Sequence, residues 1–270
     1  MKIRGKKILE YKIIKSLGKE GNVFLYSAID QKKQKSVNLK TLDLNDIERS
    51  NLKQVIENIE NRIETIKKFD NSNIQKILDF GMKDDKYFVV SEMVEGNTLA
   101  DLMDKIKNLP LTKILDLALN LCLIVIYSHN KSILHQDIRP GNIIIDIDNV
   151  RLINFAIYRS ENQSQSFYLA PEIIIGSSEY NIKSEIYSLG IIMYQMFTGK
   201  LPFEGKSHAD IINKILNQDI PSMNTYKSSI PDALDRIILK ALKRRSDQRY
   251  DSVQELYSAL NDIKGFYQRI

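Results

Sequence analysis

The chain has 270 residues, of which 43% are hydrophobic and 27% charged, and its net charge is +5. This balance predicts a globular protein with a sizeable buried core and excludes a chain that is disordered throughout. A single cysteine, Cys122, excludes a disulfide-stapled scaffold, and one cysteine with three scattered histidines excludes a zinc site.

Lysines mix with acidic residues along the whole chain, and only residues 32–35 and 243–245 concentrate basic charge. We interpret this pattern as a solvated surface and expect no nucleic-acid partner, because no basic block is long or interleaved with aromatic residues. No apolar stretch follows the basic N-terminus, so a secretory signal is not expected. The apolar segment 114–127 contains Asp116 and Asn120 and is interpreted as a buried core helix, too short and too polar for a membrane span. We therefore expect a cytoplasmic protein in which Cys122 packs in the core.

The first part of the chain is predicted to be rich in strands, with turns at residues 18–22 and 83–86. A helix is expected over about residues 45–69, because isoleucines recur there at three- and four-residue spacing and form one buried face. The expected strands cover residues 11–17, 23–28, 36–42, 74–80 and 87–93.

After residues 95–97 the pattern changes to helix, which predicts a hinge near residues 92–97 between a small β-rich lobe and a larger helical lobe. Two short strands are expected at residues 142–147 and 150–155. The expected helices cover residues 112–130, 182–197, 208–217, 232–243 and 252–264.

Residues 135–145 carry the most informative chemistry and read HQDIRPGNIII. Asp137, Arg139 and Asn142 lie in a loop restrained by proline and glycine, directly before an apolar strand. Phosphoryl transfer needs a group that orients the attacking hydroxyl, a cation near the moving phosphate and an oxygen ligand for Mg²⁺. The three residues suit these roles in that order, and a purely structural turn is the alternative.

This loop resembles the catalytic loop of protein kinases, and other motifs of that family follow the same order along the chain. Residues 37–40 resemble the V-A-I-K strand, Asn154-Phe155-Ala156 stands where D-F-G belongs, residues 168–172 resemble the A-P-E segment, and residues 185–190 resemble the central helix. The central-helix motif is similar to that of bacterial Ser/Thr kinases.

The resemblance covers one kinase domain over about residues 11–265. It implies an α+β, bilobal protein-kinase fold with a small β-rich N-lobe at residues 1–94 and a larger, mainly helical C-lobe at residues 95–270.

The resemblance also implies roles for individual residues. Asp137 and Arg139 are expected to be catalytic, and Asn142 and Asn154 are the expected metal ligands. Arg249 is expected to form a buried ion pair with Glu172. Independently of the resemblance, His129 is expected to be a hydrogen-bonded core residue rather than a base. The residues expected to bind ATP are Leu17, Gly18, Leu25, Lys40, Glu92, Val94 and Ile144.

Several residues depart from the family pattern. Asn154 replaces the carboxylate of D-F-G, and an amide keeps an oxygen but loses the negative charge that Mg²⁺ prefers. The glycine-rich loop retains Gly18 as its first glycine, and Glu20 brings a negative charge that repels phosphate. Asn38 replaces a small apolar residue that covers the adenine, and Glu185 replaces the aspartate of the central helix.

The glutamate that pairs with the V-A-I-K lysine, here Lys40, is left open by the sequence. An ungapped count places Arg62 at that position, while Glu60 and Glu64 are out of phase by one or two residues. Each residue of offset turns a side chain by about 100° around a helix. A helix irregularity would bring either glutamate into place.

Taken with these departures, the resemblance implies a pseudokinase that retains a nucleotide cleft, binds ATP with weak or absent Mg²⁺ or Mn²⁺, and acts by binding a protein partner. The alternative is a weakly active Ser/Thr protein kinase that transfers the γ-phosphate of ATP to a hydroxyl of a protein substrate. In that alternative Asn142 and Asn154 hold the metal through their carbonyl oxygens, and Asp137 orients the hydroxyl.

Overall fold

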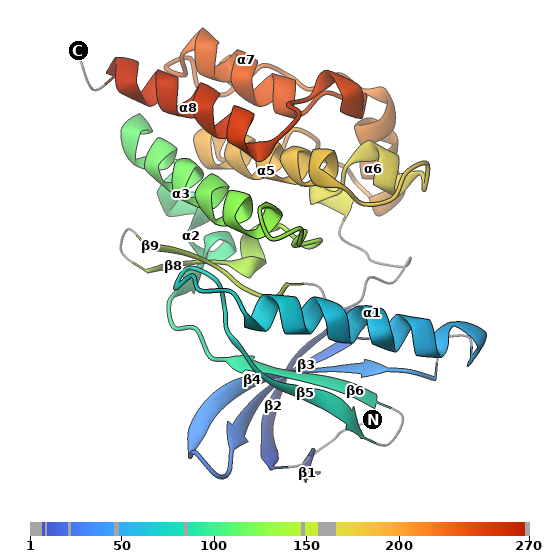
Figure 1. Cartoon of the computed structure of the whole chain (residues 1–270). Helices are drawn as coiled ribbons and strands as arrows, with labels where there is room; N and C mark the ends of the chain where they lie inside the picture. The colour runs from blue at the N-terminus through green and yellow to red at the C-terminus, as the bar shows by residue number, and fades with distance from the viewer. Residues whose placement is uncertain are drawn as a thin grey trace. The chain divides into compact units, whose positions relative to one another are not determined.

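A computed structural model describes residues 7–8, 10–20, 23–45, 49–83, 86–146, 149–155 and 166–267. Contacts divide the described residues into two compact units, one with the residues up to Glu95 and one with those from Gly96 onward (Figure 1). Residues 21–22 and 84–85 of the two expected turns, the end of the expected strand at Ile147, and Ala156 of the D-F-G position lie outside the described residues.

The first unit contains a six-stranded antiparallel sheet with the order β1-β2-β3-β4-β6-β5. Alternate residues of a strand point to opposite faces, and both faces of this sheet are apolar. One face carries a cluster that includes Tyr26, Leu39 and Val90. The strands are β1 (Lys7–Ile8), β2 (Tyr11–Glu20), β3 (Val23–Asp30), β4 (Lys35–Asp43), β5 (Ile77–Lys83) and β6 (Lys86–Glu92).

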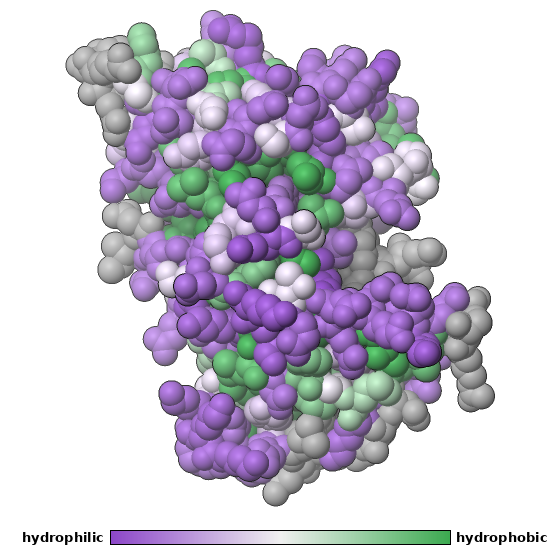
Figure 2. Space-filling model, in the orientation of Figure 1, coloured by the Kyte–Doolittle hydropathy of each residue, from purple (hydrophilic) through white to green (hydrophobic). Residues whose placement is uncertain are grey.

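Helix α1 (Arg49–Lys67) covers the opposite face of this sheet (Figure 1). Its Ile59 and Ile63 are buried in one cluster with Leu42 of β4 and Val89 of β6. Figure 2 shows a mainly hydrophilic outer surface along this helix. The amphipathic helix expected from the isoleucine spacing is therefore confirmed, although it begins later than expected.

Two expected strand boundaries in this unit are wrong. Strand β2 continues through Gly18 to Glu20, where a turn was expected, because Gly18 pairs with Leu25 and Glu20 with Val23. Strand β5 begins at Ile77, whereas the apolar pattern placed its start at Ile74. Ile74 is buried in a turn whose backbone N–H donates to the Asn71 carbonyl, so its side chain packs without belonging to β5.

The second unit is mainly helical, as expected, and carries a small antiparallel sheet with the order β7-β8-β9. Its α-helices are α2 (Leu99–Ile106), α3 (Leu111–His129), α4 (Pro171–Ile174), α5 (Ile182–Thr198), α6 (His208–Asn217), α7 (Asp232–Ala241) and α8 (Val253–Tyr267). The strands are β7 (Asn97–Thr98), β8 (Ile143–Asp146) and β9 (Asn149–Leu152), and the 3-10 helices are η1 (Pro140–Asn142), η2 (Ser166–Tyr168), η3 (Met223–Thr225) and η4 (Ser246–Gln248).

Helix α3 forms part of the core of this unit and packs against α8 and β9. Ten of its side chains are buried, among them Cys122, and burial raises the pKa of the Cys122 thiol to about 12. At 19 residues, α3 is the one helix in the described part of the chain that is long and apolar enough to cross a membrane. The expectation that this segment is too short and too polar for a span is therefore wrong, whereas the expectation of a core helix is confirmed.

The backbone at Gly96 predicts a loss of stability when a side chain is added. Its φ of +125° lies where L-residues are strained, and an added Cβ would stand 2.6 Å from the Ile144 Cγ2 atom. We expect Gly96→Ala to lower the free energy of unfolding by about 1–3 kcal/mol, measured by urea denaturation. Gly176, which has a φ of +65° and open space around it, is the matched control. An equal loss in Gly176→Ala would contradict the role of the close approach to Ile144.

Candidate functional site

The candidate catalytic loop lies between α3 and β8 and gathers the three predicted side chains around one carboxylate. Arg139 Nε lies 3.2 Å from Asp137 Oδ1 and donates to Oδ2 at 3.3 Å. Asn142 Nδ2 donates to the Asp137 backbone carbonyl at 2.9 Å and to Oδ2 at 2.5 Å. Pro140, the first residue of η1, suits a helix start because its fixed φ is helical. The loop therefore holds the Asp137 carboxylate between a guanidinium and an amide.

Asn154 follows β9 and joins this network from the second predicted metal position. Its backbone has a φ of +64°, in the left-handed region where Asn is better tolerated than most residues. Its Nδ2 donates to Asn142 Oδ1 at 3.0 Å. A continuous series of hydrogen bonds therefore runs from Asn154 through Asn142 to Asp137.

This arrangement does not fit Mg²⁺. The two predicted metal ligands are joined to each other, and the Asn142 oxygen expected to face a cation accepts an N–H from Asn154 instead. Both side chains are neutral amides, whereas Mg²⁺ prefers charged oxygen ligands. The described residues contain no group of three or more His, Cys, Asp or Glu side chains that could hold a metal ion.

His135 contacts Phe155 and the backbone around Asp137. His135 is buried, its Nε2 lies 2.9 Å from the Ile153 carbonyl, and its Nδ1 accepts the Asp137 backbone N–H at 3.1 Å. This pattern places the proton on Nε2. The ring centroids of His135 and Phe155 lie 4.4 Å apart. The ring two residues before Asp137 therefore packs against the ring that follows Asn154.

Glu185 of α5 anchors the same loop through a fully buried carboxylate. Its Oε1 accepts the backbone N–H of Gln136 at 2.7 Å, and its Oε2 lies 2.6 Å from His129 Nε2. Gln136 has a φ of +67°, which turns its N–H toward the central helix. The expectation that His129 is a hydrogen-bonded core residue is confirmed. Sequence reasoning missed its partner, Glu185, because no motif links the two residues, which are 56 positions apart.

The expected ion pair between Arg249 and Glu172 is confirmed in the core of the same unit. The guanidinium donates to both carboxylate oxygens at 2.8 Å. It also donates to the backbone carbonyls of Lys183, Lys243 and Arg244. The group joins the A-P-E segment to the chain before α8.

In the first unit, three of the residues predicted to bind ATP form one row across the sheet. Gly18 of β2 pairs with Leu25 of β3, and Leu25 pairs with Lys40 of β4. Directly paired residues point to the same face, so Leu25 and Lys40 share the face that α1 covers. Leu17 is exposed beside a register shift between Ser16 and Gly18.

The next row on this face is polar where the family pattern is apolar. Asn38 pairs with Ser27 of β3 on one side and with the buried Ser91 of β6 on the other. Three short polar side chains therefore stand beside Leu25 and Lys40, at the place where the family pattern has an apolar cover for adenine.

The predicted hinge residues have backbone groups that are partly engaged already. The Glu92 carbonyl accepts from Gln75 Nε2 at 2.8 Å, and Glu92 Oε1 accepts the Lys76 backbone N–H at 3.1 Å. Val94 follows β6 and is half-buried. Ile144, the remaining predicted ATP residue, is buried in β8 of the second unit.

The two candidate glutamates of α1 both act on a buried tyrosine of the sheet. Burial raises the pKa of the Tyr87 hydroxyl, and the negative charges of Glu60 and Glu64 raise it further. Glu64 also lies 3.9 Å from the ammonium of Lys67. Which glutamate pairs with Lys40 stays a prediction.

Comparison with known families decides what this fold is. A model of the protein kinase domain matches residues 11–259. The chain belongs to the protein kinase domain family.

Relatives agree with this assignment. Serine/threonine-protein kinase PrkC of Bacillus subtilis is 30% identical over 272 residues, which cover 96% of this chain and 41% of that protein. A probable serine/threonine-protein kinase of Clostridium acetobutylicum, CA_C1728, is 28% identical over 95% of this chain and 40% of that protein. The chain thus spans about two fifths of the length of these relatives.

The solved structures give the same fold. A crystal structure of Rad53 residues 1–466 in complex with AMP-PNP superposes with a TM-score of 0.73 at 21% identity, over 94% of this chain and 65% of that chain. The expected bilobal protein-kinase fold, with a β-rich N-lobe and a helical C-lobe, is confirmed.

Proposed function

We propose that this kinase domain is a pseudokinase that acts mainly by binding a protein partner. One observation carries the proposal: the Asn154 amide donates to the Asn142 oxygen at 3.0 Å, where the family pattern places a metal ion between two ligands. An N–H group here satisfies the Asn142 oxygen without a cation. A carboxylate lacks this donor, so the amide satisfies the Asn142 oxygen where a carboxylate could not.

ATP is the proposed nucleotide, bound with weak or no Mg²⁺ or Mn²⁺. The row of Gly18, Leu25 and Lys40 on one sheet face supports a phosphate contact in the first unit. The Rad53 domain carries an ATP analogue in its structure, and we extend that property to this chain as part of the proposal. The polar side chains of Ser27, Asn38 and Ser91 replace an apolar cover and weaken adenine binding.

The alternative is a weakly active Ser/Thr protein kinase. It is favoured by the Asp137 carboxylate, which Arg139 and Asn142 hold in a fixed orientation, and by the relatives named as Ser/Thr kinases. Activity in this alternative requires Asn154 to release Asn142 Oδ1, so that the oxygens of both amides are available to a cation.

The experiment measures transfer of labelled γ-phosphate from ATP to the chain itself and to myelin basic protein, with Mg²⁺ or Mn²⁺ present. We expect no transfer above that of Asp137→Ala. Asp137, which orients the hydroxyl, is present, but Asn154 replaces the carboxylate whose negative charge would hold the metal ion. Thermal unfolding with ATP, in the presence of EDTA, tests nucleotide binding separately. Transfer that is robust in the wild type and lost in Asp137→Ala would replace the pseudokinase by the kinase.

A further inference from the structure

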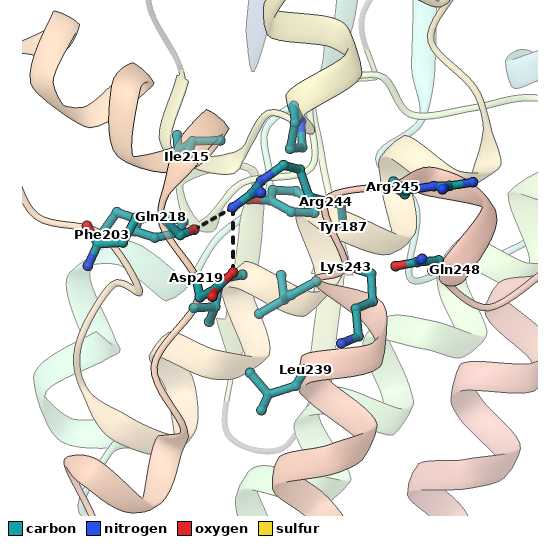
Figure 3. A pocket seen from close by; sticks show the side chains of 13 residues that line it. Tyr187, Phe203, Ile215, Gln218, Asp219, Leu239, Lys243, Arg244, Arg245 and Gln248 are labelled. Carbon is teal, nitrogen blue, oxygen red and sulfur yellow. Dashed lines mark hydrogen bonds and ion pairs between the residues drawn. The ribbon is translucent and has the colours of Figure 1, made fainter.

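A hydroxyl inside the first unit lacks a hydrogen-bond partner. Tyr87 of β6 is fully buried, and its hydroxyl is not hydrogen-bonded to any of the described residues. The equally buried Tyr194 donates its hydroxyl to the Pro221 carbonyl at 2.9 Å. Tyr187, a third fully buried tyrosine, lines a cavity of the second unit together with Arg244 (Figure 3). An unsatisfied buried hydroxyl costs free energy, which favours a second state in which Tyr87 finds an acceptor.

Glu60 of α1 is the acceptor that fits this hydroxyl. Ile59, the residue before it, is buried in the same cluster as Tyr87. Glu60 is half-buried, and its carboxylate forms no hydrogen bond or ion pair with the described residues. Glu64 lies one turn later, but its carboxylate is 3.9 Å from the Lys67 ammonium. Burial raises the pKa of the Tyr87 hydroxyl, and the charge of Glu60 raises it further, as expected of neighbouring groups. A buried donor and a half-buried acceptor therefore lie near each other without being joined.

Lys40 offers Glu60 a second donor on the same face of the sheet. In β6, Val89 pairs with Lys40 of β4, and Tyr87 pairs with Leu42. Residues two apart on a strand point to the same face and are about 6.6 Å from each other. Leu42 and Tyr87 are buried in the cluster that α1 completes, so this is the face that α1 covers. Glu60 therefore has two donors spaced by one strand repeat, and accepting from one draws the carboxylate away from the other.

We propose that Tyr87 and Lys40 compete for the Glu60 carboxylate, and that a small movement of α1 decides between them. In one state the Tyr87 hydroxyl donates to Glu60, which satisfies the buried group. In the other state Glu60 forms an ion pair with Lys40 and orients its ammonium, while the hydroxyl stays unsatisfied. Tyr87 is thus a positioning residue that acts on Lys40 through Glu60. The consequence for ATP rests on the proposed function, whereas the competition itself is measured without nucleotide.

A double-mutant cycle in urea denaturation, without nucleotide, tests the bond between Tyr87 and Glu60. We expect Tyr87→Phe to raise the unfolding equilibrium constant about fivefold, and to have no effect in the Glu60→Ala background. Glu57→Ala is the matched control, because Glu57 is exposed on the same helix and should leave the effect of Tyr87→Phe intact. Tyr194→Phe, which loses the bond to Pro221, shows the effect expected of a bond that the structure contains. A more stable Tyr87→Phe, or an equal loss in the Glu60→Ala background, would overturn the proposal.

Removing the second donor tests the competition, again without nucleotide. Lys40→Met leaves Glu60 with Tyr87 alone, so the coupling between these two residues, as a ratio of unfolding constants, should increase about threefold. Lys35→Met is the matched control, because Lys35 is exposed on the same strand, and it should leave the coupling unchanged. An unchanged coupling in Lys40→Met would overturn the competition.

ATP binding in EDTA measures the consequence for the nucleotide site. We expect Tyr87→Phe to raise the affinity for ATP about threefold, because Glu60 then stays with Lys40. The gain should disappear in the Glu60→Ala background. ATP that binds equally to the wild type and Tyr87→Phe would overturn the positioning role. If ATP binds to neither, the proposed nucleotide site fails, while the unfolding cycles still decide the competition.

Discussion

Replacing Arg249 by alanine is expected to lower the free energy of unfolding by about 3–5 kcal/mol. The substitution leaves the Glu172 carboxylate buried with one remaining side-chain donor among the described residues, Ser184 Oγ at 3.2 Å. It also removes the donor of three backbone carbonyls. An uncompensated buried charge costs far more than the loss of one surface contact, and urea denaturation measures the difference.

Arg245→Ala is the matched control for this prediction. Arg245 pairs with Asp247 with a 2.6 Å contact, but both side chains are more than half exposed, so the unfolding midpoint should not change. Arg249→Lys keeps the charge and loses the paired geometry, so an intermediate loss is expected. It also provides a measurable variant if alanine prevents folding. A loss in Arg249→Ala as small as that of Arg245→Ala would show that the pair contributes little.

Replacing Asn154 by aspartate is expected to have opposite effects without and with a divalent cation. In EDTA the variant loses the donor to Asn142 Oδ1 and places two oxygen acceptors face to face, which should lower stability by about 1–3 kcal/mol. With Mg²⁺ and ATP the added charge supplies the missing ligand. We expect the melting temperature to rise with Mg²⁺ in the variant and not in the wild type, and phosphate transfer to appear.

Asn213→Asp controls for the change of charge. Asn213 is exposed on α6, and its Oδ1 accepts from Asn217, a contact that an aspartate retains. It should show no response to Mg²⁺. If Asn154→Asp is as stable as the wild type in EDTA, or ignores Mg²⁺, the hydrogen bond between the two amides is not what replaces the metal.

Periodicity was enough to predict most helices. The helix expected at 208–217 agrees with α6, and the isoleucine spacing found the buried face of α1, because a 3.6-residue repeat determines which side chains reach the core. Strand ends were less predictable. Gly18 suggested a turn, but the pairing of β2 with β3 continued past it, and that pairing depends on the partner strand.

The candidate site was predictable in its residue types and not in its contacts. The loop residues Asp137, Arg139 and Asn142 were recognised from one short segment. The hydrogen bond from Asn154 depends on a left-handed backbone and on the direction of two amides, neither of which a residue pattern contains. The same holds for Glu185. The sequence showed that it is longer than the aspartate of the family pattern, but not that its carboxylate contacts His129.

The burial of Cys122 allows cysteine labelling to measure how often the core of the helical unit opens. Because this is the chain's one cysteine and it lies fully inside α3, an alkylating reagent reaches the sulfur only when the surrounding helices separate. The labelling rate therefore measures how often that core opens, while the sheet unit, which has no cysteine, contributes no signal. A partner that stabilises the packing of these helices would slow alkylation of the Cys122 sulfur without contacting it.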